Sequence, residues 1–245
     1  DKNKKTNKYY EVLKKLIDLK EDGSFCLNQT YFSYMYKDKM FSKKLTKLIE
    51  VPPRKYKDKL KKEHKNLAAG LQLIIEEVII KILNHVHKET KANNLVMSGG
   101  VALNSVLNGK ILRKTKFENI WIQPASSDAG SSLGVAMYIY NSILKKKRNY
   151  IIENDYFGPS FSDKEIREFL ESVRIKYYEF KTKKELIKTI AKLLSEDQII
   201  GWFQGRMEFG PRALGNRSIL ANPKNPKIKD ILNKKIKFRE EFRPF

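Results

Sequence analysis

The sequence predicts an α/β protein, and three observations support that class. Helix-like and strand-like segments alternate over residues 66–144, a glycine pair directly follows one strand-like segment, and a second glycine-rich stretch follows another near residue 204. With 245 residues, 41% of them hydrophobic, the chain is large and apolar enough for one large domain or two ordinary ones. With only 12 Gly and 8 Pro, the composition excludes a disordered or fibrous protein.

The first half of the chain contains most of the alternation. Apolar residues at helical spacing predict a helix over residues 9–20, which ends before the turn Asp22-Gly23, and a longer helix from Asn66 to Thr90. Four further elements follow: a strand at Asn94–Met97, a helix from Val101 to about Leu112, a strand at Asn119–Gln123, and a helix after Asp128 that ends near Leu144.

The second half begins after a boundary predicted near residues 145–155, where a basic run meets polar residues. We therefore expect domains at 1–150 and 151–245. Ser162 and Glu165 have the spacing of a capping box, which predicts a helix from there to about Val173. A strand at 175–180, a helix at 183–195 and a strand at Gln198–Gln204 are expected to follow.

Several protein classes are excluded by composition. The most apolar stretch, Leu71–Leu83, contains three charged residues and is too short to cross a bilayer, so no membrane partner is expected. Cys26 is the single cysteine, which excludes an internal disulfide and fits a reducing, cytoplasmic compartment. The first ten residues contain neither an apolar signal core nor a Met, so we expect the sequence to be a fragment of a longer chain.

The net charge of +22 would ordinarily indicate a nucleic-acid partner. However, 40 of the 50 basic residues are Lys, dispersed along the chain in a manner typical of a solvated surface. Arginine is instead concentrated, because five of the ten lie in the last 40 residues: Arg206, Arg212, Arg217, Arg239 and Arg243. The planar guanidinium of Arg is suited to carboxylate and phosphate groups.

Two segments could bind ligands near predicted strand ends. Ser98–Asn104 joins a strand to a helix through Gly99 and Gly100, where a nucleotide phosphate or ribose could approach the backbone. The alternative is a tight turn without a ligand. Asp128 follows the next strand and could hold a metal or cap the following helix.

The three histidines do not complete a metal site with Asp128. His85 and His87 are two residues apart on a helix and cannot face one ion together, and His64 is isolated in the sequence. A metal would therefore need ligands from outside this chain.

The segment 201–218 is the most informative. It follows an apolar strand and contains four glycines and three arginines, Arg206, Arg212 and Arg217. Glycines expose backbone N–H groups and arginines supply bidentate charge, which together favour a phosphate site. The alternative is a solvated basic loop.

Taken together, four motifs of the sequence resemble those of a known family. Four motifs are similar in order and spacing to carbamoyltransferases of the NodU/CmcH type: S-G-G-V-A-L-N, Q-P-A-S-S-D-A-G-S-S-L-G, G-R-M-E-F-G-P-R-A-L-G-N-R-S-I-L and L-N-K-K-I-K-F-R-E-E-F-R-P-F. The resemblance runs from about Gly23 to Phe245 and covers less than half of a family member. It implies that an H-x-x-x-H metal pair lies upstream of this sequence.

The resemblance implies a fold and a reaction. The fold would be the end of an actin-like ATPase domain followed by the start of a YrdC-like domain. The reaction would be ATP-dependent O-carbamoyl transfer, in which carbamoyl phosphate is activated as a carbamoyl-adenylate and a hydroxyl group of a small molecule or sugar attacks it.

The resemblance also implies residue roles. Gly99, Gly100 and Asn104 would contact the nucleotide, and Asp128 would bind a divalent metal, iron or magnesium, whose other ligands lie outside this chain. Carbamoyl phosphate would be bound by five arginines, Arg206, Arg212, Arg217, Arg239 and Arg243. Arg206, Glu208 and Arg212 would be catalytic, with Glu208 as an orienting group.

We therefore predict a carbamoyltransferase. We expect the 245-residue chain to be inactive by itself. Two alternatives are an enzyme of tRNA threonylcarbamoyl modification and a non-catalytic basic protein that binds nucleic acid. The motifs favour the enzymes that act on small hydroxyl compounds, and no nucleic-acid partner is expected.

Overall fold

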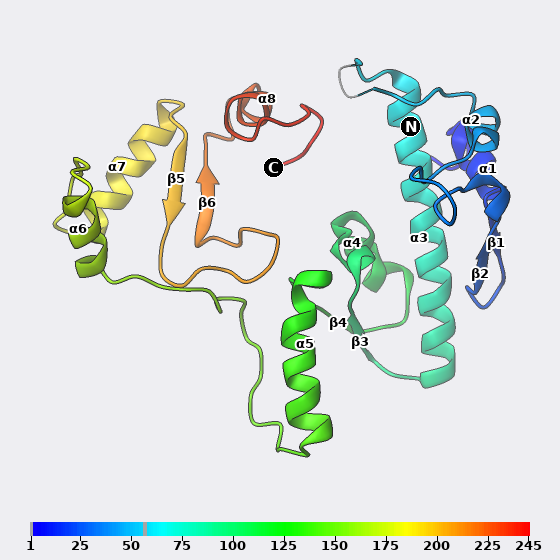
Figure 1. The fold of residues 1–245 in the computed structure, drawn as a ribbon, viewed down its shortest axis with the longest axis horizontal. Coiled ribbons are helices and arrows are strands. Elements are labelled where there is room, and N and C mark those ends of the chain that lie inside the picture. The colour runs from blue at the N-terminus through cyan, green and yellow to red at the C-terminus, as the bar shows by residue number, and fades with distance from the viewer. Residues whose placement is uncertain (1, 56–57) are drawn as a thin grey trace. The chain divides into compact units, whose positions relative to one another are not determined.

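The structure is a computed structural model that describes residues 2–55 and 58–245 (Figure 1). It is mixed α/β, as predicted, with small two-stranded sheets. Two compact units are present, one ending at Ser127 and the other comprising Asp128–Phe245. The domain division expected at 150/151 stays a prediction.

The unit ending at Ser127 is built around one long helix. Its elements are α1 (Lys8–Lys14), β1 (Ile17–Leu19), β2 (Phe25–Leu27), α2 (Lys43–Ile49), α3 (Lys62–Thr90), β3 (Asn94–Met97), α4 (Ser105–Lys114) and β4 (Asn119–Ile122). Short 3-10 helices occupy Gln29–Tyr31 and Gly100–Leu103. The predicted long helix and the strand at Asn94–Met97 are thus confirmed.

Two apolar clusters hold this unit together, one on each part of α3. In the first, Tyr9 and Leu13 of α1 pack with Leu73 and Ile74 of α3. The second contains Leu83 of α3 together with residues of β3, α4 and the approach to β4, namely Leu95, Leu107, Ile111 and Phe117. Leu107 and Ile111 are fully buried, so α4 is anchored to the sheet end of α3.

The helix expected over residues 9–20 is wrong in its second half. It ends at Lys14, and Ile17–Leu19 pairs antiparallel with Phe25–Leu27. The turn between these strands passes through Gly23, whose φ of +85° suits glycine. Periodicity within one segment could not reveal this hairpin, because the pairing depends on the second strand.

The strands β3 and β4 pair in parallel, with Asn94 opposite Asn119 and Met97 opposite Ile122. Their carboxyl ends therefore meet at one edge, where the glycine turn begins. The helix expected from Val101 instead begins as a 3-10 turn, and α4 starts only at Ser105 because Asn104 has a non-helical backbone (φ −78°, ψ 89°).

The unit Asp128–Phe245 begins with a 3-10 turn, Asp128–Gly130, and a helix that is α5 (Ser131–Tyr138) and then a π-helical turn (Ile139–Ile143). Its other elements are α6 (Asp163–Ser172), α7 (Lys183–Ser195), β5 (Ile200–Phe203), β6 (Arg217–Leu220), α8 (Ile228–Ile231) and a π-helical turn at Leu232–Ile236. The strands β5 and β6 pair antiparallel, with Phe203 opposite Arg217. The arginine-rich segment is the connection between them.

Local signals in this unit have a mixed outcome. The capping box is confirmed, since the Ser162 N–H donates to Glu165 Oε2 and the Glu165 N–H donates to Ser162 Oγ. The helix at 183–195 is also confirmed. The strand at 175–180 is wrong, because those residues have no regular structure and no partner strand in the described chain.

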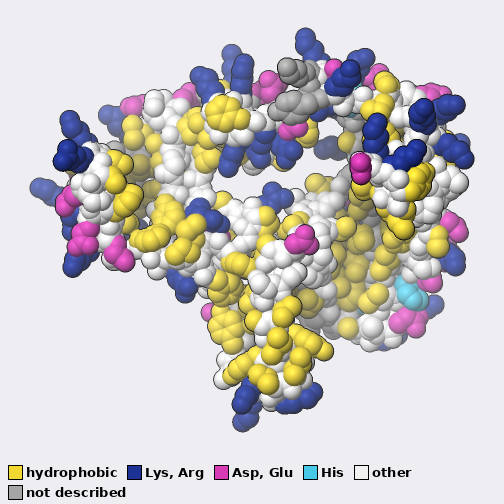
Figure 2. Space-filling model, in the orientation of Figure 1, with side chains coloured by type: hydrophobic (Ala, Val, Ile, Leu, Met, Phe, Trp, Pro, Cys, Tyr) yellow, Lys and Arg dark blue, Asp and Glu magenta, His cyan; other side chains and the backbone are white. Residues whose placement is uncertain are grey.

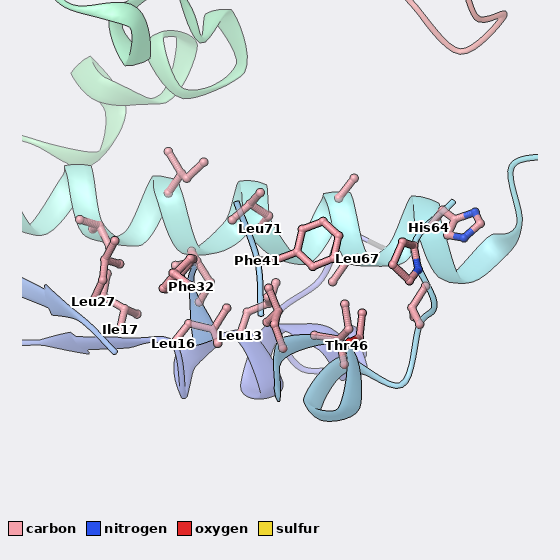
Figure 3. Close-up of a pocket in the computed structure, with 18 of the residues that line it drawn as sticks. Leu13, Leu16, Ile17, Leu27, Phe32, Phe41, Thr46, His64, Leu67 and Leu71 are labelled. Atoms are coloured by element: carbon pink, nitrogen blue, oxygen red, sulfur yellow. The ribbon is translucent and has the colours of Figure 1, made fainter. Parts of the chain in front are cut away.

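The surface of the unit ending at Ser127 contains an apolar hollow of about 710 Å³ between α3 and the elements packed against it. Leu13, Leu16, Leu67 and Leu71 contribute to its lining, and His64 lies at one end (Figure 3). Lys and Arg side chains are spread over much of the visible surface (Figure 2), as expected for dispersed lysine. Within the described residues, no helix is long and apolar enough to cross a membrane.

Candidate functional site

The glycine turn lies at the carboxyl edge of β3 and is open to solvent. Gly99 has a φ of +95°, and a side chain built there would meet nothing within 4 Å, so the space above the turn is free. The Gly99 N–H donates to Ser126 O at 2.6 Å, which ties the turn to the segment after β4. Among the described residues, no acceptor is bonded to the N–H groups of Gly100 and Val101. The turn therefore offers two backbone donors to a ligand.

Asn104, the third predicted nucleotide contact, uses its side chain within the protein. Its Oδ1 accepts from the Leu107 N–H at 3.1 Å and so caps α4. The same Oδ1 accepts from Gln72 Nε2 at 3.2 Å, and Asn104 Nδ2 donates to Gln72 Oε1 at 2.9 Å. The structure thus places Asn104 directly behind the glycine turn, as a capping residue.

Three residues that the sequence analysis did not identify extend this contact. Gln72 Nε2 also donates to Glu76 Oε1 at 3.0 Å, and Lys110 Nζ lies 2.6 Å from both carboxylate oxygens of Glu76. Glu76 is buried between α3 and α4. A signal for it existed, because Gln72 and Glu76 are polar residues four apart on an otherwise apolar helix face.

Asp128 lies exposed at the start of the 3-10 turn in the second unit. It does not cap the following helix, because the N-cap of α5 is Gly130 and no side chain bonds there, so the capping alternative is wrong. Among the described residues, no group of three or more His, Cys, Asp or Glu side chains is placed to bind a metal ion. The residues described here therefore do not fit a complete metal site, and the role of Asp128 stays a prediction.

The connection between β5 and β6 is organised around the carboxylate of Glu208, whose side chain has no exposed area. Its Oε1 accepts from the backbone N–H groups of Leu214 and Asn216, each at 2.7 Å, and of Arg217 at 3.1 Å. Its Oε2 accepts from Arg217 Nε at 3.0 Å, and Arg217 Nη2 donates to the backbone oxygen of Glu208 at 2.7 Å. The loop is thus closed on itself by one carboxylate.

These contacts determine the ionisation of Glu208. Burial raises the pKa of its carboxyl group, but the hydrogen bonds from Leu214, Asn216 and Arg217 outweigh burial and lower the pKa to about 2. Glu208 is therefore a fixed anion at neutral pH. Its position suits it to hold the loop in shape and to neutralise Arg217, while its catalytic role stays a prediction.

Within this loop the arginines differ in what they contact. Arg206 donates to the backbone oxygens of Gly158 at 3.0 Å and Phe157 at 3.3 Å, and its own backbone oxygen accepts from Asn216 Nδ2 at 2.7 Å. Arg212 is exposed and, in the part of the chain that the structure describes, has no hydrogen-bond or ion-pair partner. The loop therefore presents Arg212 as a cation with unused donors.

Comparison with known proteins identifies the family of the chain. Residues 5–137 match the family described as "Carbamoyltransferase N-terminus", and residues 191–245 match "Carbamoyltransferase C-terminus". The chain belongs to the carbamoyltransferase family. The first match includes the glycine turn and Asp128, and the second includes the whole loop around Glu208.

Three relatives illustrate the similarity. The chain is 41% identical over 239 residues to the uncharacterized protein sll1178 of Synechocystis sp., a match covering 96% of this chain and 39% of that protein. It is 36% identical over 183 residues to Nodulation protein NolO of Bradyrhizobium diazoefficiens, covering 75% and 33%. It is 39% identical over 184 residues to Nodulation protein NolNO of Sinorhizobium fredii, covering 75% and 27%. The chain thus spans about two fifths or less of the length of these relatives.

The two remaining predicted arginines of this carbamoyltransferase chain lie after the last helical turn and have partners there. Arg239 Nε donates to Asn233 Oδ1 at 2.6 Å, and its guanidinium carbon lies 4.6 Å from the ring centre of Phe245. Arg243 Nε donates to Glu240 Oε2 at 2.9 Å. Within the described residues, no hydrogen bond or ion pair joins either arginine to the loop around Glu208. Their role in carbamoyl-phosphate binding stays a prediction.

A polar pocket of about 420 Å³ lies beside Arg206, lined also by Tyr150, Asn154, Tyr156 and Phe157. Sequence analysis did not identify this pocket, because its walls come from the segment before α6. Asp155 lies in the same segment, and its backbone oxygen accepts from the Phe209 N–H at 2.7 Å. Its carboxylate is buried, and Oδ1 has no partner among the described residues, so burial raises the pKa of Asp155.

Proposed function

We propose that this chain provides carbamoyl-phosphate and nucleotide contacts for ATP-dependent O-carbamoyl transfer to a hydroxyl group of a small molecule or sugar. In this reaction the carbamoyl group is activated as a carbamoyl-adenylate before the hydroxyl attacks. We further propose that residues 1–150 belong to an actin-like ATPase domain and residues 151–245 to a YrdC-like domain. Family membership and the order of helices, strands and glycine turn support this assignment.

The loop around Glu208 is the observation that carries the proposal. A loop that presents a cation to a small anion needs a stable shape, and the four bonds accepted by one buried carboxylate supply it. Because Glu208 neutralises Arg217 within the loop, the charges available to an incoming phosphate are those of Arg206 and Arg212, and of these two only Arg212 has no partner among the described residues. Its guanidinium can donate two parallel hydrogen bonds to phosphate oxygens.

Arg206 would form a second wall of the donor site. Its Nε and Nη2 are held by backbone oxygens, so the guanidinium is fixed in direction beside the polar pocket. Donors fixed before the ligand arrives lose little freedom on binding, which favours recognition of the charge that develops on the phosphate.

The glycine turn would contact the nucleotide through its backbone. The N–H groups of Gly100 and Val101 are the available donors, and the open space over Gly99 allows close approach. We derive no step through a metal ion, because the described residues do not complete a site for one.

The test measures carbamoyl-phosphate binding to the 245-residue chain by calorimetry, with Arg212→Ala and the control Arg148→Ala. Both substitutions remove one exposed arginine from the second unit. We expect Arg212→Ala to weaken binding about tenfold or more, because a charged hydrogen bond contributes roughly 1.5–3 kcal/mol. Arg148→Ala should change it less than twofold.

Equal weakening by both variants would show that the chain attracts anions through net charge alone, and the proposal would be wrong. Salt provides a second check against a nucleic-acid partner. Duplex DNA binding through dispersed lysines should weaken steeply with salt, whereas binding of carbamoyl phosphate to a few arginines should weaken only slightly.

A further inference from the structure

A continuous chain of polar contacts crosses the otherwise apolar interface between α3 and α4. It runs from Lys110 through Glu76 and Gln72 to Asn104, and every link is 2.6–3.2 Å long. Glu76 is only 9% exposed, so its charge is costly to bury and is compensated by Lys110 and by the Gln72 amide. Well-packed apolar side chains often stabilise such an interface as much as a buried ion pair does. What these polar contacts can determine, and apolar contacts cannot, is the orientation of the Gln72 and Asn104 side chains.

The contacts leave each amide group only one orientation. The carboxylate of Glu76 accepts but cannot donate, so Gln72 must direct its NH₂ group toward Glu76 and its oxygen toward Asn104 Nδ2. At the other end, the Leu107 N–H only donates, so Asn104 must direct Oδ1 toward it. Turning either amide over would place donors against donors.

The oriented Asn104 fixes where the glycine turn ends. Its cap on the Leu107 N–H makes α4 start at Ser105, and Asn108 Nδ2, one turn into α4, donates to Ala102 O at 2.8 Å. The other end of the turn is fixed by β3 and by the bond from Gly99 N–H to Ser126 O. Between these two anchors lie Gly100 and Val101, whose N–H groups have no hydrogen-bond acceptor among the described residues.

We infer that Gln72 is a positioning residue: with Glu76 and Lys110 behind it, it sets Asn104 and thereby holds the free N–H groups of the glycine turn in a binding geometry for a nucleotide. The inference rests on the proposed function for the identity of the ligand. The ordering of the turn by Gln72 does not depend on it.

The test compares two variants of the full chain. Gln72→Met keeps the length of the side chain and removes its hydrogen bonds. The matched control, Asn84→Leu, removes a different amide bond between the same two helices, from Asn84 Nδ2 to Lys114 O at 3.4 Å, at the far end of α4 from the turn. Hydrogen exchange of the amides in residues 99–107 and binding of ATP are measured for each.

We expect Gln72→Met to speed amide exchange in residues 99–107 about threefold to tenfold, the effect of losing one or two ordinary hydrogen bonds, and to weaken ATP binding by a similar factor. Asn84→Leu should leave both unchanged, even where it lowers thermal stability. Thermal stability alone would respond to either variant, so it does not decide the question.

Unchanged exchange in residues 99–107 of Gln72→Met would overturn the inference, as would equal acceleration by Asn84→Leu. Faster exchange with unchanged ATP affinity would also overturn it, because the turn would then not be the binding geometry that Gln72 holds. If the unsubstituted chain binds no ATP, the proposed nucleotide site fails, and the exchange data still decide whether Gln72 orders the turn.

Discussion

Replacement of Asn104 measures what its cap on α4 and its bonds to Gln72 contribute to stability. In Asn104→Ala the cap on α4 and both bonds to Gln72 are lost together. In Asn104→Asp the side chain still accepts from the Leu107 N–H and from Gln72 Nε2, because Asp is a good N-cap and has the same length. The bond donated by Asn104 Nδ2 to Gln72 Oε1 disappears, and an acceptor oxygen of Asp then faces Gln72 Oε1.

The expected magnitudes follow from these contacts. Loss of an N-cap costs about 1 kcal/mol, and each of the two bonds to Gln72 contributes roughly 0.5–1.5 kcal/mol. Asn104→Ala should therefore destabilise the first unit by about 2–4 kcal/mol. Asn104→Asp, which loses one bond, should cost about 1 kcal/mol.

The assay is urea unfolding followed by fluorescence of Trp121, which lies in β4 of the same unit. The chain has two Trp residues, and the other, Trp202, lies in β5 of the second unit, so a Trp202→Phe background isolates the signal. If Asn104→Asp is as destabilising as Asn104→Ala, or if Asn104→Ala costs less than about 0.5 kcal/mol, the capping role is refuted.

Three further predictions concern the second unit and the chain as a whole. The pKa of Glu208 is depressed to about 2, below its ordinary value near 4.5, so the stability it contributes is complete above about pH 4.5 and is lost as the pH falls toward 2. Trp202 fluorescence should show this acid transition, and Glu208→Gln should flatten it; an unchanged acid transition would contradict the role of the carboxylate. Burial raises the pKa of Asp155, so its ionisation costs stability at neutral pH, and Asp155→Asn should stabilise the unit by about 1 kcal/mol in urea unfolding at pH 7; destabilisation would show that Oδ1 has a partner. The chain mixed with ATP, carbamoyl phosphate and divalent iron should release no pyrophosphate above background, because the described residues hold no three-ligand metal cluster; sustained release would refute the expectation of inactivity.

The sequence by itself determined the elements whose signals are local. The apolar repeat at three- and four-residue steps specifies α3, and the Ser162–Glu165 spacing specifies the start of α6 through bonds within one turn. The motifs around Gly99 and Glu208 were sufficient to indicate the family. Each of these signals lies within a short stretch of chain, so no distant contact is needed to interpret it.

Tertiary structure decided what depends on partners distant in the sequence. Ile17–Leu19 became a strand because Phe25–Leu27 pairs with it, and residues 175–180 have no such partner among the described strands. The family resemblance implied that all three arginines of the loop bind carbamoyl phosphate, yet the folded loop neutralises Arg217 with Glu208 and leaves Arg212 exposed. The fold likewise shows that Asn104 caps α4 and bonds to Gln72, 32 residues earlier in the chain, while its contact with a nucleotide stays a prediction. Which polar group remains available to a ligand depends on which others are satisfied inside the protein, and only the fold brings those groups together.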